Sequence, residues 1–298
     1  MVSVLIAGAS GMIDTALHAA LSDGGHHVHT LVRRDPRGPR EHQWRPEAGE
    51  IDSGIVSHVD VVVSLSGASL SRIPWTNAHK DSVLYSRLAA TNTLVSAIRS
   101  SATPPSLLVQ GSAVGFYGDR GDESLSEEDG RGDGFLADVV VAWEGAAHVA
   151  ASEKTRVAYA RTGLVVGKSG AMAPLRLQTI LGVGGRIGSG KQWWPWISLH
   201  DEIRALTHLI THDSAQGPFN LVGPTPATSA EITKELARLM RRPHLIGLPG
   251  FVIRGLLGEA GVALLLSSQN IRPDRLLESG FTFDDEKVAS ALDRMLSN

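Results

Sequence analysis

Short apolar runs alternate with longer stretches of helical spacing along the first two thirds of the chain. The runs at 2–7, 59–67, 105–113 and 156–167 are rich in Val, Ile and Leu, and 27–34 is a further strand that ends in two arginines. Between them, apolar residues recur at helical spacing over 12–23, 76–99 and 135–153. Strands that alternate with helices predict an α/β fold with a parallel sheet covered on both faces.

The alternation of apolar runs with stretches of helical spacing stops after Gly167. Residues 182–196 are rich in glycine and tryptophan, a helix returns at 201–212 and a short strand at 218–223. From about residue 226 the chain has helical spacing again, at 229–242 and 250–269. We therefore expect the chain to leave the sheet near Gly167, build a smaller lobe, and return to the sheet before its C-terminal helices.

A glycine turn joins the first strand to the first helix. Gly8 and Gly11 have the spacing of a dinucleotide-binding turn, in which glycines allow a tight bend and a close approach of the pyrophosphate to the helix N-terminus. The positions expected to contact the cofactor are Gly8, Ser10, Gly11, Met12 and Ile13. The third glycine of the pattern is replaced by Asp14.

The second strand ends in Arg33 and Arg34. An acidic residue at this place binds a ribose 2′-hydroxyl, whereas a guanidinium group binds a 2′-phosphate. The pair therefore favours NADP over NAD, against the alternative of a solvated basic corner. These patterns predict a Rossmann-type doubly wound sheet over 1–167, completed by about 201–223, and a substrate lobe formed by 168–200 and 224–298.

Composition narrows the class of partner. The chain has 298 residues, 42% of them hydrophobic, a formal charge of −3 and no cysteine. This balance provides no general attraction to nucleic acid or to anionic lipid, and no apolar run is long enough to span a membrane. With no signal-peptide pattern at the N-terminus, we expect a cytoplasmic protein that acts on a small molecule.

Several longer motifs occur along the chain in the order GASGMI, LVRR, SLSGAS, GSAVGFYGDRGDE, ARTGLVVG and GSGKQWWPWISLHD. In this order they resemble the atypical, epimerase-like branch of the extended short-chain dehydrogenase/reductases, a sugar-nucleotide epimerase family whose members are sometimes labelled cell-division inhibitors. A C-terminal stretch at 256–283 is similar to the tail of this branch, so the resemblance covers nearly the whole chain.

The resemblance implies an NADP-binding sheet and a substrate cleft closed by the C-terminal helices. It implies that the turn of Leu65, Ser66 and Gly67 lies along the far ribose and pyrophosphate of the cofactor. Arg161 and Val165 match the strand that leads to the substrate lobe. Arg87 stands where the extended family usually has asparagine, and either contacts the cofactor or is a surface cation.

The acid–base pair of the wider family is missing. That family uses Tyr-x-x-x-Lys on a helix, where lysine lowers the pKa of the tyrosine, and a serine on the preceding strand. Counting back from Glu144, the two positions are Leu136 and Val140, whereas Ser112 matches the serine. An isolated serine hydroxyl without a base does not replace such a pair.

Other side chains are weaker candidates for the chemistry. Tyr117 is more readily a packing residue and Asp138 a solvated helix residue, although each is a candidate acid or base. His200 and Asp201 border the expected cleft and rank below Ser112. We expect no metal site, and we expect Trp194 or Trp196 to be buried with one tryptophan of this loop exposed.

Two functions remain open at this point. One is an NADP-dependent oxidoreductase or epimerase acting on a small or nucleotide-linked substrate, such as a nucleotide sugar, with an unusual acid–base group. The other is a non-catalytic NADP-binding sensor or regulatory interaction protein. A cell-division partner is a third, weaker reading that no residue supports. The expected assembly is a monomer, or a homodimer through the helices at 76–99 and 135–153.

Asp14 bears on either function. A carboxylate in the first helical turn suits the positive end of the helix dipole. There it competes with the pyrophosphate for the same field. The sequence therefore predicts a weaker affinity for the dinucleotide than glycine at position 14 would give.

Overall fold

The computed structural model describes residues 1–8 and 11–297. Its centre is an eight-stranded sheet in the order β12-β8-β6-β5-β1-β2-β3-β4, in which all neighbours are parallel except β3 and β4. The strands that match the apolar runs are β1 (Ser3–Ala7), β2 (His27–Val32), β5 (Val61–Ser64), β6 (Leu107–Ala113), β8 (Arg156–Thr162) and β12 (Gly217–Leu221). The predicted doubly wound α/β fold is confirmed.

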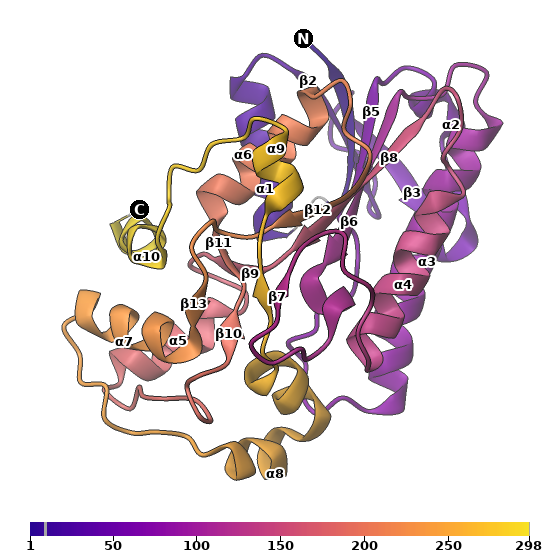
Figure 1. The fold of residues 1–298 in the computed structure, drawn as a ribbon. Coiled ribbons are helices and arrows are strands. Elements are labelled where there is room, and N and C mark those ends of the chain that lie inside the picture. Colours follow the sequence, from indigo (N-terminus) through magenta and orange to yellow (C-terminus); the bar gives the residue numbers. More distant parts are fainter. Residues whose placement is uncertain (9–10, 298) are drawn as a thin grey trace.

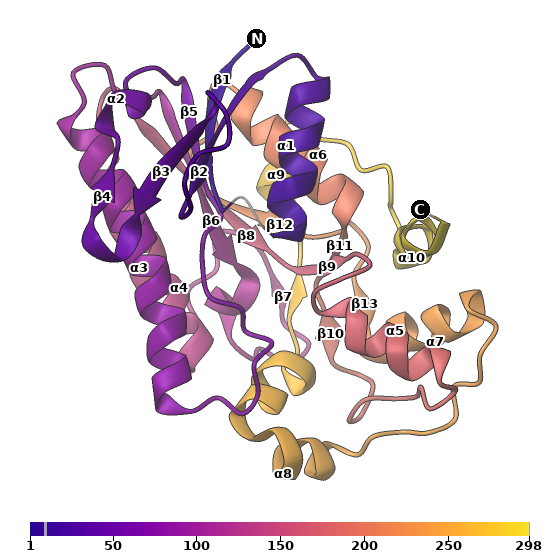
Figure 2. The same cartoon turned by 180° about the vertical axis from the view of Figure 1, so that it is seen from behind.

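Two layers of helices cover this sheet (Figures 1 and 2). On one face lie α1 (Met12–Asp23) and α6 (Leu199–Thr211), which bury Leu17, Leu21 and Leu206 against Val4 and Ile6. On the other face lie α2 (Ser53–Val56), α3 (Asn77–Ser100) and α4 (Phe135–His148). Because β1, β5 and β6 are covered on both faces, their apolar residues form continuous runs at 4–7, 61–63 and 107–109 and do not alternate with polar ones.

Two strands at one edge of the sheet were not predicted from the sequence, because they contain no apolar run. They are β3 (Glu41–Arg45) and β4 (Glu50–Ile51), with a 3₁₀ turn at Pro46–Ala48 between them. Of the side chains of β3, only Trp44 is buried, since this strand lies near the edge of the sheet. An edge strand with polar side chains has no apolar run for a sequence reading to detect.

The chain leaves the sheet at Gly163. A side chain there would overlap the carbonyl of Pro195, so the predicted strand at 156–167 divides into β8 and a separate β9 (Leu164–Val166), which pairs with β11 (Trp196–Ser198). A third apolar cluster then forms around Met172, Trp194, Trp196 and Ile232. Both Trp194 and Trp196 are buried, and Trp193 is half-buried, so these rings anchor the smaller lobe.

The remaining elements of that lobe and of the tail are short. They are α5 (Met172–Ile180), β10 (Trp193–Trp194), β13 (Ala227–Thr228), α7 (Ser229–Leu239), α8 (Gly250–Gly261), a π-helical turn at Val262–Leu266, α9 (Asp274–Glu278) and α10 (Val288–Ser297). A further small pair joins β7 (Ser124–Leu125) to β14 (Asn270–Ile271).

The C-terminal tail returns to the sheet before its last helix. Leu276 and Phe281 belong to the same apolar cluster as Val4 and Ile6, and α9 packs on β12. In Figure 1 this yellow segment runs alongside α1 and α6. Residues 274–283 therefore pack with the central sheet, while the last helix packs on α7 and β11 of the smaller lobe.

No helix in the described part of the chain has the length and apolar character needed to cross a membrane.

Candidate functional site: a glycine turn beside a buried polar network

Two turns meet where the order of the sheet reverses. The chain proceeds from β1 outward to β2 and β3, then returns to β5 on the other side of β1. Leu65 N–H donates to the carbonyl of Ala7 (2.9 Å), and the backbone of Leu65 lies against Gly8. In open α/β sheets, ligands bind in the crevice outside the carboxyl ends of the strands at such a reversal.

The geometry of the first turn requires its glycines. Gly8 has φ +128°, which L side chains rarely adopt, and a Cβ there would also lie 2.7 Å from Asp14 Oδ1. Helix α1 starts directly after Gly11. Ile13 packs on the apolar cluster between α1 and the sheet, while Met12 lies against Gly167 and Ser169 of the smaller lobe. Ser10 lies outside the described residues.

Asp14 fills the space beside both glycines. Its Oδ2 accepts a hydrogen bond from Gly11 N–H (3.1 Å), and the residue is only 6% exposed. Burial raises the pKa of this carboxyl from 3.8 to about 7, partly offset by the backbone N–H groups of Gly11 and of Asp14 itself. A carboxyl group thus occupies the mouth of the turn.

The second turn is held by Arg87 from α3. Its guanidinium lies under Gly67 and donates to the carbonyls of Ala68 and Val83, each at 3.0 Å, and it lies over the ring of Trp143 at 4.9 Å. Burial lowers the pKa of Arg87 to about 10. Arg87 therefore lies inside the site and is not a surface cation. Ser66 is buried and Leu65 half-buried at the same turn.

The two arginines after β2 are in different situations. Arg34 forms a double hydrogen bond with Glu41 (2.6 and 2.7 Å), which holds the pKa of Glu41 at about 2. Arg33 makes a single exposed ion pair with Glu47 at 3.2 Å. An exposed pair of this kind contributes little and exchanges partners readily, whereas a double hydrogen bond fixes both groups. Of the two side chains, Arg33 is the more available to a ligand.

Ser112 belongs to a buried ion-pair network. Ser112 and Arg161 are directly opposite each other on β6 and β8, and α4 places Glu144 on the same face. Ser112 Oγ donates to Glu144 Oε1 (2.6 Å), and Arg161 binds both oxygens of Glu144 through Nε and Nη2, each at 2.9 Å. Charge-assisted hydrogen bonds thus fix the orientation of the Ser112 hydroxyl.

Each guanidinium nitrogen of Arg161 donates to a residue of this network. Its Nη1 donates to Tyr117 Oη (3.0 Å), and its guanidinium stacks on Phe116 at 3.6 Å from the ring centre. Tyr117 in turn donates to Asn220 Oδ1 (2.8 Å) and is fully buried. Burial is the main cause that raises the pKa of Tyr117. Both side chains therefore serve the interior of the protein.

Asp138 lies away from this network. It is on the exposed side of α4, where it pairs with Arg131 at 2.6 Å. Leu136 packs against Gly115 at the end of β6, and Val140 is buried one turn further along α4. The two positions that carry Tyr and Lys in the wider family are thus occupied by apolar side chains, one beside Gly115 and one buried on α4.

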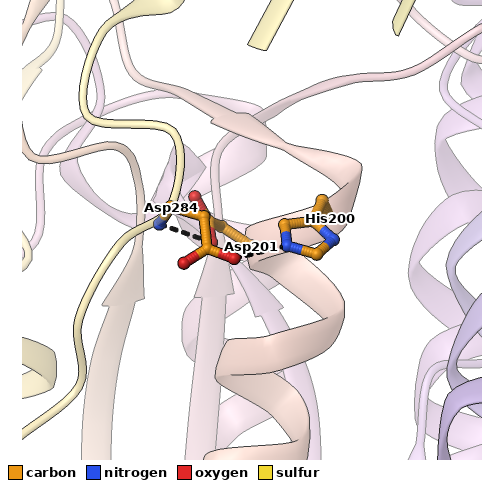
Figure 3. Close-up of side chains that lie close together, drawn as sticks. All are labelled: His200, Asp201 and Asp284. Atoms are coloured by element: carbon orange, nitrogen blue, oxygen red, sulfur yellow. Dashed lines mark hydrogen bonds and ion pairs between the residues drawn. The ribbon is translucent and has the colours of Figure 1, made fainter. Parts of the chain in front are cut away.

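His200, Asp201 and Asp284 form a cluster at the start of α6 (Figure 3). His200 Nε2 lies 2.7 Å from Asp284 Oδ2, and Asp201 accepts the N–H groups of Asp284 and Asp285. Arg204 lies on both carboxylates, at 2.7 Å from Asp201 and 3.2 Å from Asp284. Arg204 thus bridges the two carboxylates, and the cluster attaches the tail to α6.

Comparison with known proteins identifies the family. The model of the NAD dependent epimerase/dehydratase family matches residues 4–223, and a domain of unknown function matches residues 248–295. The chain belongs to this epimerase family. The resemblance read from the motifs is thereby confirmed, including the distinct C-terminal segment.

Individual relatives cover nearly the whole chain. An epimerase family protein of Mycobacterium leprae is 41% identical over 97% of this chain and 94% of its own length. The crystal structure of the human epimerase family protein SDR39U1 with NADPH has a TM-score of 0.90, 31% identity and 99% coverage of both chains. A nucleoside-diphosphate sugar epimerase from Corynebacterium glutamicum has a TM-score of 0.81 and 32% identity, covering 99% of this chain and 58% of that one.

Two carboxyl groups of this epimerase-family chain were missed by the sequence reading. In the sequence, Glu144 only marked the position from which Leu136 and Val140 were located. In the structure it binds both Ser112 and Arg161. Glu202 is fully buried on α6, where it accepts from Thr162 Oγ1 (2.8 Å), and burial raises its pKa to about 8. Helical spacing places each on a buried face, but only the fold shows which strand residue each one meets.

Proposed function

We propose that the chain binds NADP(H) across the ends of β1, β2 and β5 and acts as an oxidoreductase or epimerase-like enzyme on a small molecule. One observation carries the proposal: a glycine turn at the reversal of the sheet lies beside a strand that ends in an exposed, weakly paired arginine. The conformation of Gly8 and the start of α1 fit a pyrophosphate, and Arg33 fits a 2′-phosphate.

Two relatives support the details of this proposal. The human relative was solved with NADPH, and the relative from Corynebacterium glutamicum is described as a nucleoside-diphosphate sugar epimerase. We therefore take NADP(H) as the cofactor and a nucleotide-linked sugar as the first substrate class to test. We place this reaction in the cytoplasm, as the sequence suggested.

Each residue at this site has its own proposed role in binding the cofactor or shaping the site. NADP(H), when bound, supplies or accepts a hydride. Arg87 holds the turn at 65–67 and contributes positive charge beside it, while Arg33 binds the 2′-phosphate and Arg34 fixes the loop after β2 through Glu41. Leu136 and Val140 provide no group that could donate or accept a proton.

Ser112 is the proposed proton-exchanging group. Its hydroxyl is polarised by the Glu144 carboxylate at 2.6 Å, which is a partner that the sequence reading lacked. Tyr117 and Asp138 are weaker candidates, because the first is fully buried and the second is exposed on α4 and paired with Arg131. Arg161 acts by positioning Glu144.

A second function has its own supporting observation. The Ser112 hydroxyl is already committed to a buried carboxylate, and the tyrosine and lysine positions are Leu136 and Val140. A protein with this centre would bind NADP(H) without turnover and report the redox state of the cofactor to a partner.

Binding and turnover separate these functions. Titration with NADPH and NADH, followed by fluorescence, is expected to give at least about tenfold tighter binding of NADPH, and the Arg33→Ala variant is expected to lose that preference. An equal affinity of the unmodified protein for both cofactors would contradict the assignment of Arg33.

Turnover is tested next with NADPH-dependent reduction of carbonyl compounds and with epimerisation of nucleotide sugars. Activity that disappears in Ser112→Ala while NADPH affinity stays unchanged supports the enzyme. Tight NADPH binding with no turnover of any substrate supports the sensor.

A further inference from the structure

The carboxyl of Asp14 is located where a dinucleotide-binding turn receives its anion. It lies in the first turn of α1, with Oδ2 on the N–H of Gly11 and Oδ1 directed at Gly8. The backbone N–H groups at a helix N-terminus, together with the helix dipole, attract one negative charge. In this protein the electric field at the N-terminus of α1 already acts on the carboxyl of Asp14.

The two oxygens of this carboxyl are not equivalent. Oδ2 has its backbone donor, whereas Oδ1 is buried and has no hydrogen-bond partner among the described residues. A buried carboxylate oxygen without a donor is costly, and the cost is relieved by binding a proton. Oδ1 is therefore the atom on which a proton would reside.

Ionisable groups on the surrounding elements do not neutralise Asp14. The turn at 65–67 has no ionisable side chain, and the cation behind it, Arg87, donates to backbone carbonyls. On α6, Arg204 pairs with Asp201 and Asp284, and Glu202 binds Thr162. The remaining ionisable groups on α1, β2, α6 and the segment after β9 are His18, Asp23, His27, His29, Lys168, His200 and His208.

None of these side chains contributes to the shifted acidity of Asp14. Its causes are burial and two backbone N–H groups alone. The protonation state of the carboxyl is therefore set by the turn itself and by whatever anion enters it.

We propose that binding of a dinucleotide at this turn is coupled to the uptake of one proton by Asp14. This inference rests on the proposed NADP(H)-binding function. A pyrophosphate brought next to an ionised Asp14 would place two anions in one desolvated field, which is repulsive. With a proton taken from solvent onto Oδ1, the carboxyl is neutral and becomes a hydrogen-bond donor in the same turn.

The coupling predicts a pH-dependent affinity. Below the pKa of Asp14, near 7, the proton is already bound and the dissociation constant for NADPH is constant; above it, the constant rises tenfold per pH unit. Between pH 6 and pH 8.5 the loss of affinity from this source is about 30-fold. Asp14 would thus make the cofactor occupancy of the protein responsive to pH near neutrality.

The test compares the full chain with its Asp14→Asn variant, which keeps the shape of the side chain and cannot ionise. NADPH affinity is measured for both between pH 6 and pH 8.5. The 2′-phosphate titrates near pH 6 in both experiments, so the ratio of the two dissociation constants isolates Asp14. That ratio is expected to rise by about 30-fold over the range; a ratio that stays constant overturns the proposal.

A second measurement needs no variant. Calorimetric titration with NADPH at pH 8, in two buffers of different ionisation enthalpy, counts the protons taken up on binding. About 0.9 proton is expected for the unmodified protein, because the 2′-phosphate is fully ionised at this pH and Asp14 is mostly ionised. Zero uptake overturns the coupling.

The outcomes distinguish a failure of NADP(H) binding from a failure of the proton coupling. If neither protein binds NADPH at any pH, the proposed function fails and this inference fails with it. If both bind NADPH with the same pH dependence, only the role of Asp14 is wrong. Binding by Asp14→Asn that stays tight above pH 8, where the dissociation constant of the unmodified protein has risen more than tenfold, supports both.

Discussion

The glycine turn and the network around Ser112 each contain a buried acidic side chain, but their surroundings are opposite. Glu144 is matched by Arg161 through two hydrogen bonds and receives a third from Ser112. Asp14 receives only the backbone N–H groups of Gly11 and of Asp14 itself, and no cation among the described residues contributes to its acidity. The comparison shows that a buried carboxyl becomes part of the scaffold when its charge is matched, and a proton-binding group when it is not.

Breaking the matched pair is expected to have the largest effect. In Glu144→Ala, Arg161 becomes an uncompensated buried charge, which destabilises the fold by about 3–5 kcal/mol. Urea unfolding at pH 7 measures this loss. The control is Glu47→Ala, which removes an exposed partner of Arg33 and is expected to change stability by less than about 1 kcal/mol. Equal losses in the two variants would show that the buried network does not hold the site together.

Removing the unmatched charge is expected to act in the opposite direction. The folded-state pKa of Asp14 is raised from 3.8 to about 7. The folded state therefore retains a proton that the unfolded chain loses, and the contribution of Asp14 to stability falls as pH rises from about 4 to 7, then levels off. Asp14→Asn is expected to remove this contribution, to leave the slope that Glu202 causes up to about pH 8, and to be more stable at pH 7 by at most about 4 kcal/mol.

Urea unfolding of both proteins at several pH values between 4 and 8 measures the slope. An unchanged slope in Asp14→Asn would mean that another group, such as Glu202, carries it. Glu202→Gln is the matched control, since that carboxyl is also buried with a raised pKa but lies away from the turn. If the pH dependence of stability becomes smaller in Glu202→Gln but not in Asp14→Asn, then Glu202 on α6, and not Asp14, causes it.

Ser112→Ala tests how much the serine hydroxyl contributes to the network around Glu144. Glu144 loses one donor and keeps both bonds to Arg161, so the expected loss of stability is about 1 kcal/mol. Thermal or urea unfolding provides the value. A loss as large as that of Glu144→Ala would mean that the hydroxyl, and not the ion pair, organises the network.

Asp138→Asn provides the smallest expected effect. Asp138 pairs with Arg131 on the exposed side of α4, and such a pair contributes less than about 0.5 kcal/mol. Both the unfolding free energy and the NADPH affinity are expected to be unchanged. A loss of turnover at constant affinity would instead return Asp138 to the catalytic candidates.

Much of the fold followed from the sequence alone. The buried parallel strands contain continuous apolar runs, and the helices between them show their spacing clearly, so the order of the main elements along the chain was predictable. The edge strand β3 was not, because its side chains are mostly polar. The division of the strand at 156–167 was also missed, since it depends on the contact between Gly163 and Pro195, which lie far apart in the chain.

At the site, the sequence determined the glycine turn, the two arginines after β2, and the loss of the tyrosine and lysine, because each depends on spacing within one short segment. Only the tertiary structure decided the state of the charged side chains. It joined Glu144 to Arg161 and Ser112, tied Arg34 to Glu41, and enclosed Asp14 without a cation. Whether a carboxyl is a structural ion or a proton acceptor depends on burial and on partners from other segments, and local sequence contains neither.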